Sequence, residues 1–539
     1  MANAPAMAPT HGPDFDAKVD DRQLNDVEGD SKETQVVRTG SAGIGFRLSG
    51  LWHRHDLNDF HQEAIDRYGR DGDISEEMET RVKRKIDLIV LPCLGICYAF
   101  YYIDKTTLSY AAIFGISDPQ IGLGLHGTQY SWLSAVFYFG WLVWSIPSNF
   151  ILQKTPPVSY LGLNIFLWGA FLMAQAAVHS FAALTVLRIL SGAFEAIADP
   201  AFMLITTMWY TSAEQPSRIS AWYAFNGVGV GLGGLIGYGI GHINGSLASW
   251  RYEFILVGAV CAAWSITLLA LIPNTHASAW WLTREERLIS VARLRHNQTG
   301  IANRSYKKDQ FVECLLDPKT WTFFLIGFLG AIPNGGISNF STLVIKGLGF
   351  DNLHTALLGL PQGALVCIWI GAGALLNAKL PSNSRTWVCM IFMLPTIAGS
   401  LGFLLAPNDA YVGRLICFYL TGSYQTSFVI CLSLITSNTA GQTKKTLTSA
   451  LIWFGSCIGS ISSPFFYKTD QAPTYRLGIG SMLASNILEL LCFVFLRWYL
   501  SRENRKKEQL RQNGDVPDIN STTFSDLTDK QNPNFRYVY

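Results

Sequence analysis

Residues 129–153 read QYSWLSAVFYFGWLVWSIPSNFILQ, 25 consecutive residues that include no Asp, Glu, Lys or Arg. A helix needs about 20 mostly apolar residues to cross the roughly 30 Å hydrocarbon core of a bilayer, so this run is long enough to do so. Helices of soluble domains bury one apolar stripe and keep a polar face, and this run has no such face. The stretch therefore predicts a membrane-spanning helix.

The composition of the whole chain indicates many such helices. Of its 539 residues, 49% are apolar and 15% are charged, whereas soluble domains contain about 25% charged residues. The formal net charge is +2, which lacks the basic excess expected of a nucleic-acid-binding protein. We therefore expect an all-α, polytopic membrane protein. Its partner would be the lipid bilayer, and we expect no binding to nucleic acid.

Twelve runs are long and apolar enough to be spans, and they fall into two groups of six. The expected spans are 86–113, 128–152, 158–178, 181–210, 219–242, 250–272, 320–346, 353–377, 386–406, 411–437, 447–467 and 475–499. This spacing predicts five parts, with two six-helix bundles on either side of a polar connector. The parts are an N-terminal tail 1–85, a bundle 86–272, the connector 273–319, a bundle 320–500 and a C-terminal tail 501–539.

The placement of Lys and Arg predicts the orientation. Both residue types gather in the tails, the connector and the loops on one side, and are absent from the opposite loops 114–127, 179–180, 243–249, 347–352 and 407–410. Because cytoplasmic loops carry the excess of Lys and Arg, both termini are expected in the cytoplasm. The polar residues 1–50 and 512–539 are expected to be disordered. Thr283 and Glu286 have the spacing of a capping box at the start of a charged connector helix.

Charged residues within the spans are concentrated in spans one and four. Arg188 and Glu195 are seven residues apart and lie on one helix face, and Asp199 follows Glu195 by four. Asp104 and Lys105 lie in the outer half of span one, at a height close to that of Arg188. Because charges inside a bilayer are costly, such residues are functional candidates. A salt-bridge network that only joins the helices is the structural alternative.

The neutral polar residues of the spans are weaker candidates. Gln425, in LTGSYQ (420–425), stands where Glu195 stands in LSGAFE (190–195). The segment AIPNGGISNF contains Pro333, Gly335 and Gly336, and we expect them to interrupt span seven. Asn226, Asn334 and Asn339 would offer donors to a cavity, or else join helices by hydrogen bonds.

Several motifs of enzymes and metalloproteins are missing. The sequence contains no GxxxxGK[ST], HExxH or CxxC. A GxGxxG at 229–234 lies in the middle of a Gly-rich span, without the strand–turn–helix context of a dinucleotide site, and is better explained by close helix packing. We therefore expect no enzymatic activity, no cofactor and no bound metal.

Five stretches resemble one branch of a known family, the fungal allantoate permease-like anion:cation symporters of the major facilitator superfamily. They are QYSWLSAVFYFGWLVWSIPSNFILQ (129–153), LRILSGAFEA (187–196), MWYTSAEQPSRISAWYAFNG (208–227), LDPKTWTFF (316–324) and IPNGGISNFSTLVIKGLGF (332–350). The resemblance covers roughly residues 86–500 and implies the major facilitator fold. One departure is LQKTPPVSYLG (152–162), which replaces the superfamily's usual Gly–Asp–Arg loop signature.

The resemblance implies proton-coupled uptake of a small organic carboxylate, such as allantoate, ureidosuccinate or nicotinate. Wider relatives carry an acid next to a base in span one and an Arg seven residues before a Glu in span four, as Asp104–Lys105 and Arg188–Glu195 do here.

Roles for the candidate residues follow from the chemistry of buried carboxyls beside cations. Glu195, coupled to Asp104, would carry the proton, and Arg188 and Lys105 would hold the substrate carboxylate. The neutral groups that complete the expected site are Asn226, Asn334, Asn339 and Gln425. We expect a monomer in the plasma membrane. Export of an acidic metabolite and nutrient sensing without transport are the alternatives.

Overall fold

The computed structural model describes residues 60, 62–64, 66–68, 74–211, 214–243, 245–294, 307–407, 409–472, 474–512 and 527–539. The expected disorder of residues 1–50 therefore concerns residues outside the described part. Throughout the described part, the regular elements are helices, and twelve of the helical stretches are long and apolar enough to cross a membrane.

The first six spans occupy the N-terminal half of the chain. In chain order their helices are α2 (Glu76–Ile113), α3 (Gln129–Lys154), α4 (Pro157–Gln175), α5 (Phe181–Glu195) with α6 (Ala198–Trp209), α7 (Gln215–Tyr223) with α8 (Phe225–Gly241), and α9 (Ser249–Leu271). The connector forms a short 3₁₀ turn, His276–Ser278, and the helices α10 (Arg284–Ala292) and α11 (Lys308–Leu316).

The second six spans follow the connector. Their helices are α12 (Pro318–Gly347), α13 (Asn352–Leu357) with α14 (Gly359–Lys379), α15 (Arg385–Leu405), α16 (Tyr411–Leu420) with α17 (Tyr424–Asn438), α18 (Gln442–Ser462) and α19 (Arg476–Gln512). Short 3₁₀ turns lie at Ser382–Ser384, Thr421–Ser423, Ser463–Phe466 and Thr469–Gln471.

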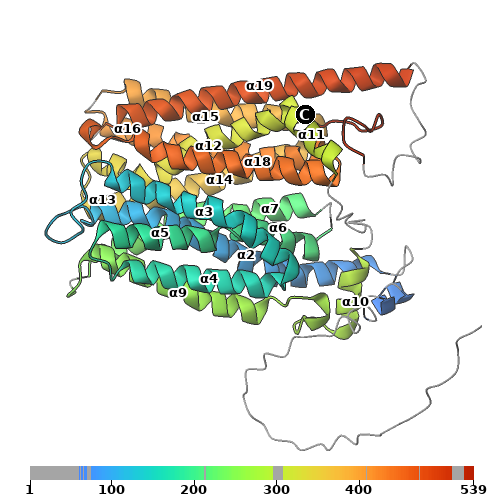
Figure 1. The fold of residues 1–539 in the computed structure, drawn as a ribbon, viewed down its shortest axis with the longest axis horizontal. Helices are drawn as coiled ribbons and strands as arrows, with labels where there is room; N and C mark the ends of the chain where they lie inside the picture. Colours follow the sequence, from blue (N-terminus) through green and yellow to red (C-terminus); the bar gives the residue numbers. More distant parts are fainter. Residues whose placement is uncertain are drawn as a thin grey trace, which may run out of the picture. The chain divides into compact units, whose positions relative to one another are not determined.

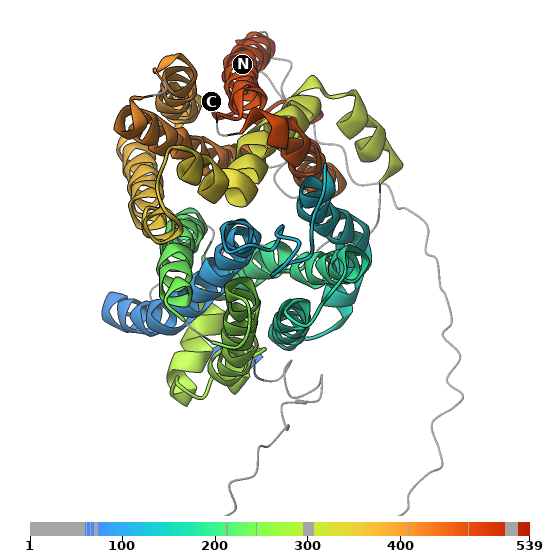
Figure 2. The same ribbon diagram turned by 90° about the vertical axis from the view of Figure 1, so that its left-hand side faces the viewer.

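The helices run roughly side by side along one direction (Figure 1). Seen end-on in Figure 2, the blue-to-green helices of the first half form one group, and the yellow-to-red helices of the second half form another. The predicted fold class, twelve spans in two six-helix bundles, is confirmed. The exact boundaries of the five predicted parts remain a prediction.

The first and last spans belong to longer helices than the sequence suggested. Helix α2 begins at Glu76, where the Ser75 side chain accepts a hydrogen bond from the backbone N–H of Met78, and it continues through the expected span without a break. The mixed-charge segment before span one is therefore the first part of the same helix. At the other end, α19 runs to Gln512, beyond the expected end at 499.

The expected interruption of span seven is wrong. Helix α12 is continuous through Pro333, Gly335 and Gly336. Proline removes only the hydrogen bond that an N–H at this position would donate to the Leu329 carbonyl, one turn earlier. Membrane helices tolerate this loss better than helices of soluble proteins do. Beside the proline, the Ser463 hydroxyl donates to the Ile332 carbonyl at 2.6 Å.

Interruptions occur instead in other spans. Residues 196 and 197 separate α5 from α6 directly after Glu195, and the 3₁₀ turn Thr421–Ser423 precedes Gln425 in the second half. The two similar motifs of the sequence, 190–195 and 420–425, thus both lie at breaks in their spans.

Residues 527–539 are packed against the second half, so the expected disorder of residues 512–539 is wrong for this segment. Asp529 is fully buried, with one carboxylate oxygen 2.6 Å from Lys319 Nζ and the other 2.9 Å from Lys444 Nζ. The Tyr537 hydroxyl donates to the same carboxylate at 2.8 Å. Burial alone would raise the pKa of Asp529, but the two lysines outweigh burial and lower this pKa to about 2.

The predicted capping box is confirmed. The Thr283 hydroxyl accepts a hydrogen bond from the Glu286 backbone N–H at 3.3 Å, and the Glu286 carboxylate accepts one from the Thr283 N–H at 3.0 Å. Glu286 also pairs with Lys85 of α2 at 2.7 Å. Burial alone would raise the pKa of Glu286, but the contact with Lys85 outweighs burial and lowers the pKa of Glu286. Helix α10 is thereby fixed to α2.

The Gly-rich span packs closely against both halves. A Cβ atom at Gly227 of α8 would lie 2.4 Å from the Gly363 carbonyl of α14, and one at Gly229 would lie 2.4 Å from the Ala99 carbonyl of α2. A Cβ at Gly239 of the same helix meets nothing within 4 Å. The glycines thus allow backbones to approach, as expected for small residues at membrane helix interfaces.

Gly227→Ala is therefore expected to destabilise the protein by about 1–3 kcal/mol, the usual cost of overpacking. Gly239→Ala is the matched control in the same helix and should leave stability unchanged or slightly raised. Thermal unfolding of both variants in detergent measures the difference. Equal melting temperatures for the two would contradict the packing role.

Asp529→Asn is expected to lower the stability of the second half by about 1.5–3 kcal/mol, because Lys319 and Lys444 each lose a charged hydrogen-bond partner. Both lysines keep Asp317 as a second anion. The lowered pKa of the wild-type carboxyl adds stability above about pH 4, and this stability is lost as the pH falls towards about 2. Unfolding measured across that pH range should show this dependence in the wild type and a weaker dependence in the variant, where Asp317, whose pKa the same lysines lower, still contributes. Glu508→Gln, at an exposed pair with Arg536, serves as the control and should leave stability nearly unchanged, because exposed ion pairs contribute little.

Candidate functional site

A cavity of about 60 Å³ lies between the two halves, midway along the spans. Its lining comes from both halves, with α2, α3, α6 and α7 on one side and α12, α17 and α18 on the other. The lining residues are Tyr98, Tyr101, Tyr102, Lys105, Tyr138, Trp141, Asp199, Tyr223, Gly330, Ala331, Asn334, Tyr424, Gln425, Phe428, Trp453, Ser456, Cys457 and Ser460.

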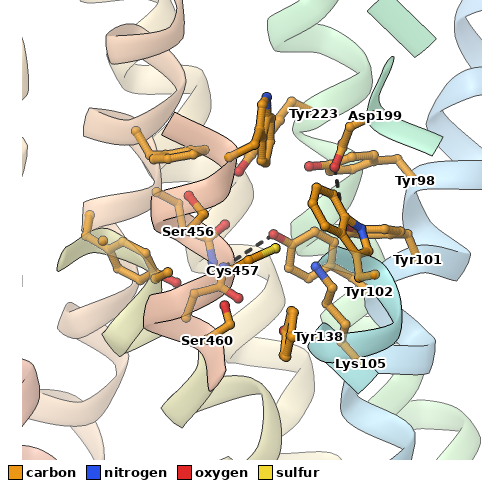
Figure 3. A pocket seen from close by; sticks show the side chains of 18 residues that line it. Tyr98, Tyr101, Tyr102, Lys105, Tyr138, Asp199, Tyr223, Ser456, Cys457 and Ser460 are labelled. Atoms are coloured by element: carbon orange, nitrogen blue, oxygen red, sulfur yellow. Dashed lines mark hydrogen bonds between the residues drawn. The ribbon is translucent and has the colours of Figure 1, made fainter. Parts of the chain in front are cut away.

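One face of α2 supplies the aromatic wall of this cavity (Figure 3). Tyr98, Tyr101, Tyr102 and Lys105 follow the spacing i, i+3, i+4, i+7, which places them on a single helix face. The rings of Tyr98 and Tyr101 stack with centroids 5.5 Å apart. The segment CYAFYYIDK thus gives the cavity a flat, partly polar surface.

Lys105 is the only Lys or Arg among the lining residues, all of which belong to the described part of the chain. Its ammonium group lies 3.8 Å from the centre of the Tyr101 ring and 5.0 Å from that of Tyr102. Aromatic faces attract a cation without neutralising it. Lys105 therefore keeps its positive charge available to the cavity.

Two carboxyl groups, those of Asp199 and Glu195, interact electrostatically with Lys105. Asp199 lines the cavity and accepts a hydrogen bond from the Tyr101 hydroxyl at 3.3 Å. Glu195 is 1% exposed, and no N–H or O–H group donates to either of its oxygens in the described structure. Its carboxyl lies against that of Asp104, and the two can hydrogen-bond when one of them is protonated. The charges that act on Glu195 are, in decreasing order, those of Lys105, Asp104, Arg188 and Asp199.

Asp104 and Arg188 lie one layer behind the cavity wall. Asp104 is fully buried and accepts a hydrogen bond from the Trp168 indole N–H at 2.8 Å. Arg188 Nη1 lies 4.0 Å from the second oxygen of Asp104, and the Arg188 guanidinium lies 4.9 Å from the centre of the Phe137 ring. Arg188, Glu195 and Asp199 are all buried, as their predicted common inward face requires.

Amide side chains connect the two halves at this level. Asn226 of α8 donates a hydrogen bond to Gln425 of α17, and Asn334 of α12 lies 3.5 Å from the hydroxyl of Tyr102 on α2. Gln425 and Asn334 also line the cavity. These contacts would have to break if the two halves separated.

At one end of the spans the halves are joined by hydrogen bonds that close the cavity. Ser109 bonds to Thr342 at 2.7 Å, the Tyr130 hydroxyl donates to the Asn339 carbonyl at 2.7 Å, and Ser131 donates to the Pro464 carbonyl at 3.0 Å. These contacts lie one or two helical turns beyond the cavity residues of the same helices, at the end away from α10 and α11. We call them the end seal, after this end of the spans.

The structure thus gathers most of the predicted site residues around one place. Lys105, Asn334 and Gln425 line the cavity, and Asn226 reaches it through Gln425. Asp104, Arg188 and Glu195 form the layer behind the wall. Asn339 is apart from them, because its side-chain amide donates to the Gly335 carbonyl of its own helix at 2.8 Å.

The sequence interpretation missed two features. The first is the aromatic lining, although the spacing of Tyr98, Tyr101 and Tyr102 was available as a signal. The second is a pair of buried carboxyls in spans six and twelve. Glu253 of α9 and Glu489 of α19 are both fully buried. Intramembrane charges are therefore not confined to spans one and four.

Comparisons with known proteins agree with this architecture. The family model described as Major Facilitator Superfamily matches residues 94–464. An uncharacterized transporter of Schizosaccharomyces pombe is 39% identical to the chain, covering 85% of the chain and 87% of that protein. Two proteins of Saccharomyces cerevisiae are each 32% identical over 86% of the chain. They are an allantoate permease, 88% covered, and a thiamine pathway transporter, 87% covered.

Solved structures of similar fold are membrane transporters as well. A bacterial homologue of the human lysosomal transporter Spinster has a TM-score of 0.56 at 16% identity, covering 79% of this chain and 97% of that one. The xylose transporter XylE of E. coli has a TM-score of 0.54 at 12% identity, covering 75% and 95%. The chain belongs to the Major Facilitator Superfamily and is a multi-pass membrane transporter rather than an enzyme.

Proposed function

We propose that the protein takes up a small organic carboxylate together with protons. The observation that carries this proposal is the position of Lys105, a cation in an aromatic cavity beside a group of buried carboxyls. A substrate carboxylate would pair with its ammonium group, while the tyrosines would cover the substrate's carbon skeleton. Asn334, Gln425 and Asn226 would provide neutral hydrogen-bonding groups.

The balance of buried charge supplies the coupling. Three carboxyls (Asp104, Glu195 and Asp199) surround two bases (Lys105 and Arg188), so the cluster has one excess negative charge when all five are ionised. A substrate anion adds a second excess negative charge, and uncompensated charge inside the membrane is costly. Binding of the anion therefore favours binding of protons by the carboxyls, and by linkage each ligand strengthens binding of the other.

Glu195 is the best proton carrier of the three carboxyls. Asp104 accepts from Trp168 and faces Arg188, and Asp199 accepts from Tyr101, so both ionised forms have partners. Glu195 has no such hydrogen bond, and a protonated Glu195 would leave Lys105 free for the substrate. Arg188 would hold Asp104 in place and, when the cavity rearranges, contribute to anion binding.

The position of the end seal bears on the side of the membrane from which the cavity would be closed. With both termini in the cytoplasm, as the Lys and Arg distribution predicts, the seal would close the cavity to the outside. Rocking of the two bundles, 86–272 against 320–500, would break the seal and expose the cavity alternately. Because one chain contains the whole cavity, we propose a monomer as the transport unit, in the plasma membrane.

The relatives support a small organic solute as substrate. One is named for allantoate and another for the thiamine pathway, and allantoate is a carboxylate. A competition screen of small carboxylates against acid-stimulated uptake would identify the substrate. Comparing uptake with secretion in cells lacking the protein would show the direction of transport.

Glu195→Gln is expected to abolish accumulation of substrate driven by a pH gradient, because the amide cannot carry a proton. Exchange of external for internal substrate should persist, since it requires no net proton movement. Both activities can be measured with the purified protein in proteoliposomes.

Glu253→Gln is the matched control for this experiment. It also removes a fully buried carboxyl without a hydrogen-bond partner, but one outside the cluster around Lys105, so accumulation should continue. Normal gradient-driven accumulation by Glu195→Gln would show that this residue is not the proton carrier.

Lys105→Gln is expected to raise the KM for the carboxylate by roughly tenfold to a hundredfold, which corresponds to the loss of about 1.5–3 kcal/mol from a hydrogen bond to a charged group. Lys105→Arg, which keeps the charge, should retain part of the affinity. Initial rates of uptake over a range of substrate concentrations measure both. An unchanged KM in Lys105→Gln would place the anion elsewhere.

A further inference from the structure

Glu489 of α19 is a buried acid that the proposed mechanism does not use. Its side chain is fully buried, and neither carboxyl oxygen has a hydrogen-bond partner in the described structure. Asn486 lies three residues earlier on the same helix face, is likewise fully buried, and also lacks partners for both of its amide atoms. Two unpaired polar side chains thus share one place inside the second half.

The surroundings of Glu489 contain no compensating cation in the part of the chain that the structure describes. The titratable groups that interact with it are the thiols of Cys389 on α15, Cys431 on α17 and Cys492 on α19, and the phenol of Tyr424 on α17. An isolated carboxylate in an apolar interior is strongly disfavoured, and the group takes up a proton instead.

A structural role explains this arrangement poorly. A carboxylic acid that joined two helices would donate its proton to an acceptor, and leaving buried polar atoms unpaired is costly. Here the polar atoms of Glu489 and Asn486 bond to no protein group described. Such a side chain stabilises neither helix, so its chemistry is the better reason for its presence.

The central cavity lies directly beside this carboxyl. Gly330 of α12 lines the cavity, and a Cβ atom placed there would be 3.4 Å from each carboxyl oxygen of Glu489. Because glycine has no side chain, the acid packs directly against the backbone of a residue that lines the cavity. Tyr424, which interacts with Glu489, lines the same cavity.

We propose that Glu489 is a second proton-binding carboxyl of the transporter, located in the C-terminal half, which exchanges its proton with the central cavity past Gly330. The carboxylate gains one proton from the cavity to become the neutral acid and later returns it. The inference rests on the proposed function, because Glu489 would bind one proton in addition to those that the cluster around Glu195 binds during transport. Transport would then move more positive charge inward per substrate.

Infrared spectroscopy of the full-length protein in liposomes tests this directly, with D₂O as the probe. The wild type should show a carbonyl band from protonated Glu489 that is lost in Glu489→Gln. On transfer to D₂O this band should shift, because the proton exchanges through the cavity. Gly330→Ala adds only a methyl group in ordinary van der Waals contact, and it should slow this shift while keeping the band.

Glu253→Gln identifies the comparison band, that of an equally buried and unpaired carboxyl. The titratable group that interacts with Glu253 is Tyr110, which is not a lining residue, so its band should shift more slowly than that of Glu489. If Glu489→Gln removes no band, or if the Glu489 band exchanges no faster than that of Glu253, the inference is overturned. Neither result depends on transport, so proton-driven uptake of a carboxylate would stand even if the inference about Glu489 failed. A lack of proton-driven uptake would instead refute the proposed function.

Discussion

The cost of charge inside a membrane determines how this transporter is built. Lys105, Arg188, Asp104, Glu195 and Asp199 all lie within the spans, where each isolated charge would be strongly disfavoured. The structure places them against one another, with tyrosine rings next to Lys105 and an indole N–H on Asp104. A cluster of this kind tolerates a change of one charge only if another change compensates it, which is the physical basis of coupling an anion to protons.

The scaffold serves this cluster by keeping helices close and the two halves separable. Glycines such as Gly227 and Gly229 bring α8 against α14 and α2, while the contacts across the cavity are individual hydrogen bonds that can break and re-form. By contrast, charges outside the spans hold each half together. Glu286 fixes α10 to α2, and Asp529 fixes the C-terminal segment to the second half. Alternating access would move the two halves against each other at the α8–α14 packing and at the hydrogen bonds across the cavity.

Much of the fold and part of the site could be predicted from the sequence, because long apolar runs and helix spacing are local properties. The twelve spans could be predicted from the length of apolar helix that a bilayer requires. The inward face of Arg188 and Glu195 could be predicted from the helical pitch and the cost of charge in lipid. Other features depended on tertiary neighbours. Pro333 leaves α12 continuous inside the packed bundle, and the order of residues 527–539 depends on lysines far away in the sequence. The nearness of Glu489 to the cavity depends on Gly330, a residue of another helix.

The central claim is that anion and proton binding are linked in one buried cluster. It is tested most directly by adding the transported carboxylate to purified protein in weakly buffered detergent solution, with a pH-indicator dye recording protons taken from the solution. The account predicts that substrate binding is accompanied by proton uptake, and that this uptake decreases when Glu195 is replaced by Gln. Substrate binding without any proton uptake, across the pH range in which transport occurs, would contradict it.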